Sequence, residues 1–161
     1  MALDMFLEID GVEGETQDKA MGAKGAIDIL AWSWGASQSG NMHMGSGGGG
    51  GKVSVQDISI TKYIDKASTD LLLHVCTGEH YKSAKITCRK AGGAALPYLT
   101  IEMKQVMITS LNTGGSGGED RLTENISLNF AEFKISYTEQ SDAGQAAGAL
   151  IANWDIAGNS E

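Results

Sequence analysis

Basic residues and long apolar runs are both scarce in this sequence of 161 residues. Lysine and arginine number 12 against 20 acids, which gives a formal net charge of −8. Because nucleic-acid binding depends largely on basic side chains that neutralise phosphates, this balance argues against a nucleic-acid partner. No apolar run approaches the roughly 18 residues of a membrane-spanning helix, so we expect no membrane insertion.

Residues 1–10 also lack the features of a Sec secretion signal. Their apolar stretch is interrupted by Asp4 and Glu8, and no basic residue precedes it. A Sec signal has a basic start followed by an unbroken apolar segment. If the protein leaves the cytoplasm, we therefore expect another export route to carry it.

Cysteine is limited to Cys76 and Cys88, whose spacing matches neither a CxxC motif nor a zinc site. Cys76 falls on a predicted helix and Cys88 on a predicted strand, each among apolar neighbours. Buried free cysteines are common in cytosolic proteins. We expect two buried, reduced thiols, with a disulfide as the alternative.

Residue patterns that carry catalysis or bind metals and cofactors are also missing. None of the three histidines, His43, His74 and His80, has a spacing that would place two ring nitrogens on one metal ion, so we expect exposed or locally bonded side chains. Gly45, Gly47 and Gly50 formally satisfy GxGxxG, but a strand rather than a helix is predicted after them. No serine lies in a GxSxG motif. We expect no catalytic residue, no metal and no cofactor, and therefore no enzyme.

Most of the chain alternates apolar and polar residues with the period of two that is typical of strands. The apolar phase changes within the segment 53–62, which suggests a bulge, and again midway along the two longest strands, as a bent barrel requires. The connection 11–25 is expected at the surface, and 139–149 as a loose connection. The predicted strands are 3–10, 27–35, 53–62, 81–90, 97–111, 122–138 and 150–156.

One amphipathic helix is predicted, with Ser68 or Thr69 as its cap and Gly78 at its end. Its expected apolar face consists of Leu71, Leu72, Val75 and Cys76. The fold class is mainly β: a curved β-barrel of two sheets with one short flanking α-helix, forming a single domain over 1–161. Trp32 and Trp34 share one strand face, and we expect core or interface packing rather than a sugar-stacking platform.

Glycine is concentrated in two segments. Residues 35–51 are almost wholly Gly, Ser, Asn, Met and His, and end in a run of glycines from Gly47 to Gly51. Loops of this length in compact domains are generally functional or disordered. The second segment, 112–120, places Ser116 between two glycine pairs and contributes almost nothing to a core. A plain turn between two strands is the simpler explanation of this second segment.

Residues 113–131, with the sequence TGGSGGEDRLTENISLNFA, closely resemble the haemolysin-coregulated protein (Hcp) family, the tube subunits of type VI secretion. A second similar block runs from Trp32 through His43 to Val53, followed by Gln56-Asp57 and the segment 62–66. The resemblance covers residues 1–138, with a weaker match at 154–156. Where family members often carry proline before the helix leucines, this chain has Thr69-Asp70.

The resemblance implies a homo-hexameric ring with a wide pore. Rings would stack with further copies into a tube inside a contractile sheath, behind a spike protein, and small effector proteins would bind in the lumen. The tube would be exported from the cytoplasm without a signal peptide. The expected ring-stacking residues are Gly40, His43, Gly47, Gly48, Gly49, Gly50, Gly51 and Lys52, and the expected lumen and cargo contact is Ser116.

Two other classes of function stay open on the sequence. A carbohydrate-binding β-sandwich would need Trp32 and Trp34 to be exposed. A small hydrolase on a barrel would need a cleft with converging titratable groups.

Overall fold

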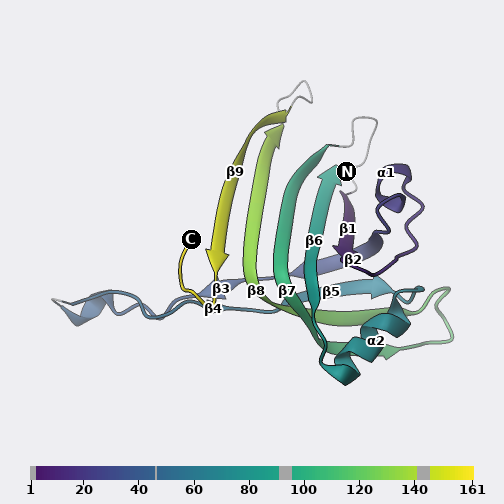
Figure 1. The fold of residues 1–161 in the computed structure, drawn as a ribbon, viewed down its shortest axis with the longest axis horizontal. Helices are drawn as coiled ribbons and strands as arrows, with labels where there is room; N and C mark the ends of the chain where they lie inside the picture. Colours follow the sequence, from purple (N-terminus) through teal and green to yellow (C-terminus); the bar gives the residue numbers. More distant parts are fainter. Residues whose placement is uncertain (1–2, 46, 91–95, 141–145) are drawn as a thin grey trace.

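A computed structural model describes residues 3–45, 47–90, 96–140 and 146–161 of the protein, and Figure 1 shows its fold. One seven-stranded sheet has the order β5-β2-β1-β6-β7-β8-β9, and a further pairing of β5 with β8 closes six of these strands into a barrel. The seventh strand, β9, extends the sheet beyond the barrel. The strands are β1 (Leu3–Ile9), β2 (Ile27–Ser33), β5 (Ile58–Tyr63), β6 (Tyr81–Lys90), β7 (Pro97–Gly114), β8 (Thr123–Gln140) and β9 (Ala146–Asp155).

The predicted class, a mainly β protein with a curved barrel, is confirmed. Two additions distinguish the observed fold from the expected one. A short helix, α1 (Lys19–Gly22), accompanies the predicted α2 (Ser68–Thr77), and β3 (Ala36–Ser37) pairs with β4 (Ser54–Val55) as a separate two-stranded sheet.

The two long strands bend where the sequence changes its apolar phase. In β7, Met103 and Val106 are both buried, and Gln105 between them has a positive φ of 55°. In β8, the first half pairs with β5, as in Ile58↔Leu128, and the second half pairs with β9. The bent strand β8 thus closes the barrel by pairing with β5 and also pairs with β9, which lies outside the barrel.

The barrel interior is filled by side chains that alternate along the strands, as the period of two predicts. Fully buried examples from four strands are Leu7, Ile27, Ile58 and Ile101. Trp32 and Trp34 are partly buried and pack against this core. Their position confirms the expected packing role and counts against a sugar-binding platform.

The segment 11–25 is more than the expected surface connection. Its helix α1 places Met21 against Phe6 and Ala26 in a second small cluster, so Phe6 is buried although it lies on the opposite face of β1 from Leu7. The Asp18 carboxylate accepts bonds from the N–H groups of Ala20 and Met21 and so caps α1.

Arg89 joins α1 to the barrel. Its Nη2 donates to the Asp18 carboxylate and lies 3.6 Å from Asp4 Oδ2, and its guanidinium lies 4.8 Å from the centre of the Phe6 ring. The hydrogen bond from the Met21 N–H, reinforced by Arg89, lowers the pKa of Asp18 from its ordinary value of 3.8.

The predicted helix is present, but its beginning differs from the expectation. Ala67 is the N-cap and makes no side-chain cap bond; neither Ser68 nor Thr69 caps the helix. Instead, Asp65, which precedes the helix, accepts a hydrogen bond at Oδ1 from the N–H of the N-cap residue Ala67 at 3.0 Å. The predicted end is confirmed, because Gly78 has a left-handed φ of 72° and donates to the His74 carbonyl.

A buried ion cluster lies beneath the start of α2. Lys62 is fully buried, and its Nζ donates to the carboxylate of Glu124 and to Asp65 Oδ1 at 3.0 Å. Ser68 Oγ donates to Glu124 Oε1 at 2.6 Å. The cluster thus joins β5, β8 and the first residue of α2, and Lys62 and Glu124 are directly opposite each other in the β5–β8 pairing.

The cysteine prediction is half right. Both cysteines are free and Cys88 is buried, but Cys76 is exposed. The helix buries Leu71 and leaves Leu72 half exposed, because only a narrow stripe of α2 faces the barrel. Burial raises the pKa of the Cys88 thiol.

The expected loose connection at 139–149 is largely strand. Strand β8 continues to Gln140 and β9 already begins at Ala146, while 141–145 lie outside the described residues. Pairings such as Tyr137↔Leu150 place the two strands side by side, so the additional C-terminal strand that the sequence suggested is confirmed.

Candidate assembly surfaces

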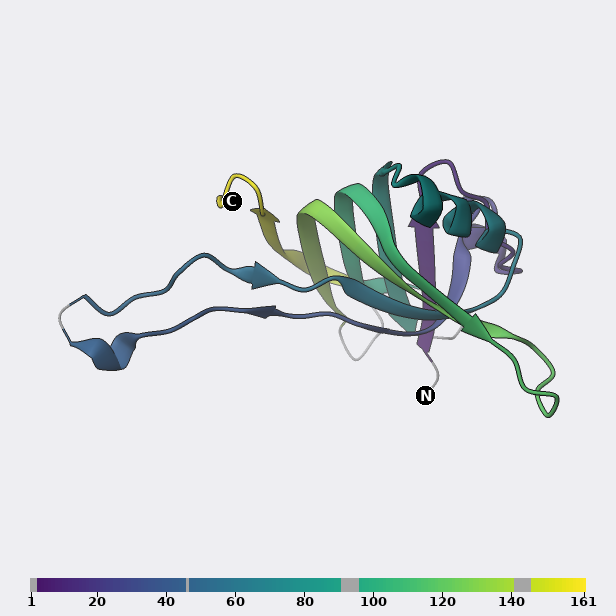
Figure 2. The same ribbon diagram turned by 90° about the horizontal axis from the view of Figure 1, so that it is seen from below.

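The glycine-rich segment forms a two-stranded ribbon that projects from the barrel. We use "the ribbon" for residues 35–56, which contain β3, the 3₁₀ turn Met42–Met44 and β4. Figures 1 and 2 both show it extending well past β9. Within the described residues β3 and β4 pair only with each other. The ribbon is therefore a two-stranded arm that projects from the barrel, with Val55 at its base packed against the core.

The ribbon tip is held by its own backbone. Gly40 and Gly50 form an antiparallel bridge, and the Asn41 side chain accepts from the Gly49 N–H at 2.6 Å. Gly45 and Gly47 have positive φ values of 79° and 130°, which glycine adopts readily and other residues do not. Glycine at positions 45 and 47 is thus explained by the backbone geometry of the tip.

All the predicted stacking residues lie in the ribbon, although this placement does not itself test their role. His43 is exposed in the 3₁₀ turn at the tip, beside Met42, which is 76% exposed. Gly40 and Gly50 are brought together, while Gly51 and Lys52 lie on the exposed return arm toward β4.

Ser116 lies far from the ribbon, in the turn of the β7–β8 hairpin. It is exposed, and its carbonyl accepts from the Glu119 N–H at 3.1 Å. Figure 2 shows this hairpin extending from the end of the molecule opposite the ribbon. The two predicted contact regions therefore occupy opposite ends of the long axis.

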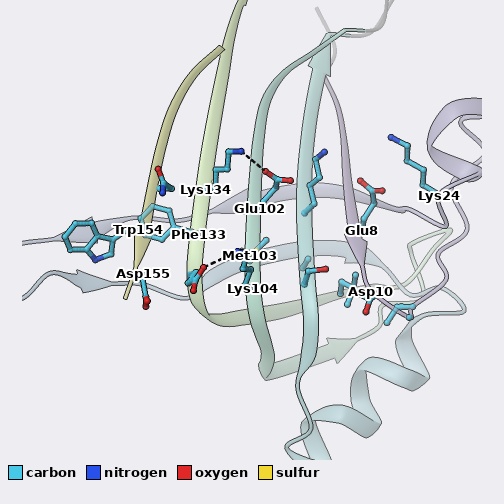
Figure 3. Close-up of a pocket in the computed structure, with 18 of the residues that line it drawn as sticks. Glu8, Asp10, Lys24, Glu102, Met103, Lys104, Phe133, Lys134, Trp154 and Asp155 are labelled. Atoms are coloured by element: carbon cyan, nitrogen blue, oxygen red, sulfur yellow. Dashed lines mark ion pairs between the residues drawn. The ribbon is translucent and has the colours of Figure 1, made fainter. Parts of the chain in front are cut away.

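A groove of about 1040 Å³ crosses the outer face of the sheet, from β1 over to β9 (Figure 3). Oppositely charged residues face each other across neighbouring strands: Lys104 Nζ lies 3.4 Å from Glu132 Oε2, and Lys134 Nζ lies 4.0 Å from Glu102 Oε2. These four side chains are 41% to 72% exposed. The groove is a solvated surface on which charge alternates from strand to strand along the row Glu8, Lys85, Glu102 and Lys134.

The sequence interpretation missed this surface. The sequence does contain a signal for this charged surface: Glu102 and Lys104, like Glu132 and Lys134, are two positions apart and therefore lie on the same face of a strand. Cross-strand pairs of opposite charge stabilise adjacent antiparallel strands.

A second, more apolar groove of about 560 Å³ lies between the ribbon base and β9. Val53, Val55, Phe133 and Trp154 are among its lining residues. Within the described part of the chain, Trp154 Nε1 is buried without a hydrogen-bond partner. Among the described strands, β9 pairs only with β8.

Exposed apolar side chains continue along β9. Leu150 is 70% exposed and Ile151 is 55% exposed. Sheet edges are usually blunted by charge or proline, and β9 carries no charge before Asp155. This edge is therefore suited to being covered by another chain.

Tyr81, Asp70 and His74 form a cluster of titratable groups between α2 and β6, outside these grooves. Tyr81 Oη donates to Asp70 Oδ2 at 2.9 Å, and the His74 ring stacks on the Tyr81 ring at 4.2 Å. Burial, followed by the Asp70 contact, raises the pKa of Tyr81. The described residues contain no group of three or more His, Cys, Asp or Glu side chains that could hold a metal ion. None of the described helices has both the length and the apolar character needed to cross a membrane.

The fold thus defines a class of closed six-stranded β-barrel proteins with a projecting two-stranded arm and an additional edge strand. The family model described as "Type VI secretion system effector, Hcp" matches residues 6–137. Protein hcp1 of Pseudomonas aeruginosa is 53% identical over 161 residues, covering 99% of this chain and 98% of that protein. The chain belongs to the Hcp family of type VI secretion proteins.

Solved structures agree with this assignment. Hcp1 from Salmonella typhimurium is 34% identical, with a TM-score of 0.80 over 99% of both chains. A structure described as a type six secretion system protein is 26% identical, with a TM-score of 0.91 over 99% of both chains.

Proposed function

We propose that this chain is a structural tube subunit that acts by contact between copies and performs no catalysis. Six copies close into a ring around a wide pore, and rings stack into a tube. The observation that carries the proposal is the ribbon, an arm that projects from the barrel and is joined within itself by the β3–β4 pairing, the Gly40↔Gly50 bridge and the hydrogen bond from the Gly49 N–H to Asn41. The folding of one subunit does not explain such an arm, whereas contact with a second copy does.

The ring requires two different patches on each subunit, because a closed ring of identical chains is joined by heterologous contacts. The β9 edge and its apolar groove supply one candidate patch. Leu150 and Ile151 are exposed there, next to a partly buried tryptophan. Burial of this surface against the next copy would remove apolar area from water and stabilise the ring.

The ribbon serves contacts between stacked rings in this proposal. Its exposed tip carries Met42 and His43, and its return arm carries Lys52. At the opposite end of the molecule, Ser116 on the β7–β8 hairpin faces the lumen and contacts small effector proteins. Repetition of a weak site around the ring raises the effective concentration of bound cargo.

The sheath, the spike protein and effectors are the partners expected beyond further copies. The subunit is made in the cytoplasm and leaves it through the type VI system. Its net charge of −8 fits protein partners better than nucleic acid.

Imaging of the purified protein tests the proposal directly. We expect ring-shaped particles of hexamer mass by negative-stain microscopy and light scattering. A monomer at micromolar concentration would contradict the ring, because the open β9 edge would then have no partner at a concentration where specific oligomers normally persist.

A further inference from the structure

The ribbon is useful for stacking only if it leaves the barrel in a fixed direction. From Ala36 to Asn41 the arm can rise by at most about 3.3 Å per residue, so the 3₁₀ turn at the tip begins up to roughly 17 Å from the base of the ribbon. A tilt of about 15° at the base would then move the tip by about 4 Å. This displacement is as large as the distance over which apolar atoms count as being in contact, about 4 Å.

The returning strand of the ribbon is fixed at Asp57, between β4 and β5. Each oxygen of its carboxylate accepts one hydrogen bond from a different strand of the barrel wall. Thr109 Oγ1 of β7 donates to Oδ2 at 2.7 Å, and Asn129 Nδ2 of β8 donates to Oδ1 at 2.8 Å.

The outgoing strand is fixed at the neighbouring position. Trp34 packs its ring 4.8 Å from that of Phe133 and donates from Nε1 to the Gln56 carbonyl at 2.9 Å. The Gln56 N–H in turn donates to the Gly35 carbonyl at 2.9 Å. Both strands of the ribbon are therefore fixed to the barrel at the base of the ribbon. Trp34 provides the aromatic contact there, and Asp57 accepts the hydrogen bonds from the barrel wall.

We propose that Asp57 is a positioning residue that sets the direction of the ribbon and thereby permits contact between stacked copies. The inference rests on the proposed stacking role of the ribbon. One consequence does not depend on stacking: without Asp57, the base of the ribbon should loosen in a single subunit. The core does not explain this carboxylate, because Thr109 and Asn129 are exposed on the outer wall of the barrel.

Hydrogen exchange of the full-length Asp57→Ala variant tests the consequence for one subunit. We expect the N–H groups of Gln56, Asn41 and Gly49 to exchange at least about tenfold faster, while the strands of the barrel keep their protection. Asp57→Asn should restore slow exchange, because its amide oxygen can accept from Asn129 and its NH₂ can donate to Thr109 Oγ1.

A matched control is available between β5 and β8. Thr61 Oγ1 donates to Asn125 Oδ1 at 2.6 Å, linking β5 to β8 on the exposed surface away from the ribbon. Thr61→Val removes one surface hydrogen bond and should leave ribbon exchange unchanged. If Asp57→Ala does not fold, the double variant Thr109→Val with Asn129→Leu takes its place in the experiment, because it removes the two side chains that donate to Asp57.

Imaging of the same samples tests the effect on assembly. Wild type and Asp57→Asn should form end-to-end tubes of stacked rings, whereas Asp57→Ala should stop at single rings. Unchanged ribbon exchange in Asp57→Ala would overturn the inference, as would normal stacking by a variant with a loosened ribbon. A ribbon-shortened variant that still stacks, or a wild type that never stacks, would instead count against the stacking role itself, and the exchange result would still decide the role of Asp57.

Discussion

The buried ion cluster under α2 gives the sharpest prediction for stability. Lys62→Met removes the only positive charge within reach of Glu124 and Asp65 in the described structure, and their side chains are 2% and 7% exposed. Breaking a buried pair by removing one partner costs about 3–5 kcal/mol, because the other charge stays buried without compensation. We expect a loss of this size in the free energy of unfolding, measured by urea denaturation at constant protein concentration.

The double variant Lys62→Met with Glu124→Leu separates charge from packing. Replacing both ions of a buried pair with apolar side chains of similar volume is often neutral or stabilising. The double variant should therefore recover part of the lost stability, while Asp65 keeps its hydrogen bond from the Ala67 N–H but lacks a counter-ion. Lys66→Met is the control: Lys66 Nζ lies 3.6 Å from Glu13 on the surface, where such pairs contribute about 0–1 kcal/mol. The reasoning is refuted if Lys62→Met costs no more than this control, or if the double variant is the less stable one.

Three further predictions concern acid stability, stacking and cargo. The pKa of Asp18 is lowered in the folded state, so its contribution to stability is complete above its ordinary value of 3.8 and is lost as the pH falls through the lowered value. Asp18→Asn should therefore lose less stability than wild type in thermal unfolding below about pH 4, and parallel curves would contradict this. Deletion of Gly47 to Gly50 should leave hexamer-sized particles in gel filtration and reduce tube formation, since these glycines lie at the ribbon tip; unfolding of the domain would assign them a structural role instead. Ser116→Gln should crowd the lumen and lower effector co-purification, with Ser116→Ala as the small control, and unchanged binding by intact Gln rings would assign Ser116 to the turn alone.

Strands were predictable because one face of each is buried, and the period of two records that burial directly. Strand β6 was predicted with its observed bounds, Tyr81–Lys90, and the bend of β7 was visible as a change of phase before Val106. The short helix α1 left no comparable pattern, because its single buried residue, Met21, lies among polar and small neighbours.

The errors in and around α2 have a shared physical origin. Helical spacing placed Leu71, Leu72 and Cys76 on one broad apolar face, but sequence does not state how wide a stripe the sheet will cover. The observed contact is narrow, so Leu72 and Cys76 remain exposed. The cap was missed for a related reason: Asp65 lies before the helix, and its role depends on a backbone turn that spacing alone does not reveal.

The ribbon shows a different limit of sequence reasoning. Its composition predicted a segment outside the core, and the structure agrees. Composition could not distinguish an ordered arm from a disordered loop, because the difference depends on long-range contacts such as those of Asp57 with Thr109 and Asn129. Sequence separations of 52 and 72 residues link these groups, and no local pattern records them.

A partial signal for the ion cluster was nevertheless present in the strands. Lys62 continues the apolar phase of Ile58 and Ile60, and Glu124 continues that of Ile126 and Leu128. A charged side chain at a core-facing position costs free energy of folding unless it pairs with an opposite charge. Two opposite charges in core phase on different strands therefore favour pairing of those strands. Here that pairing is β5 with β8, the seam that closes the barrel, so the cluster can help to specify closure as well as to anchor α2.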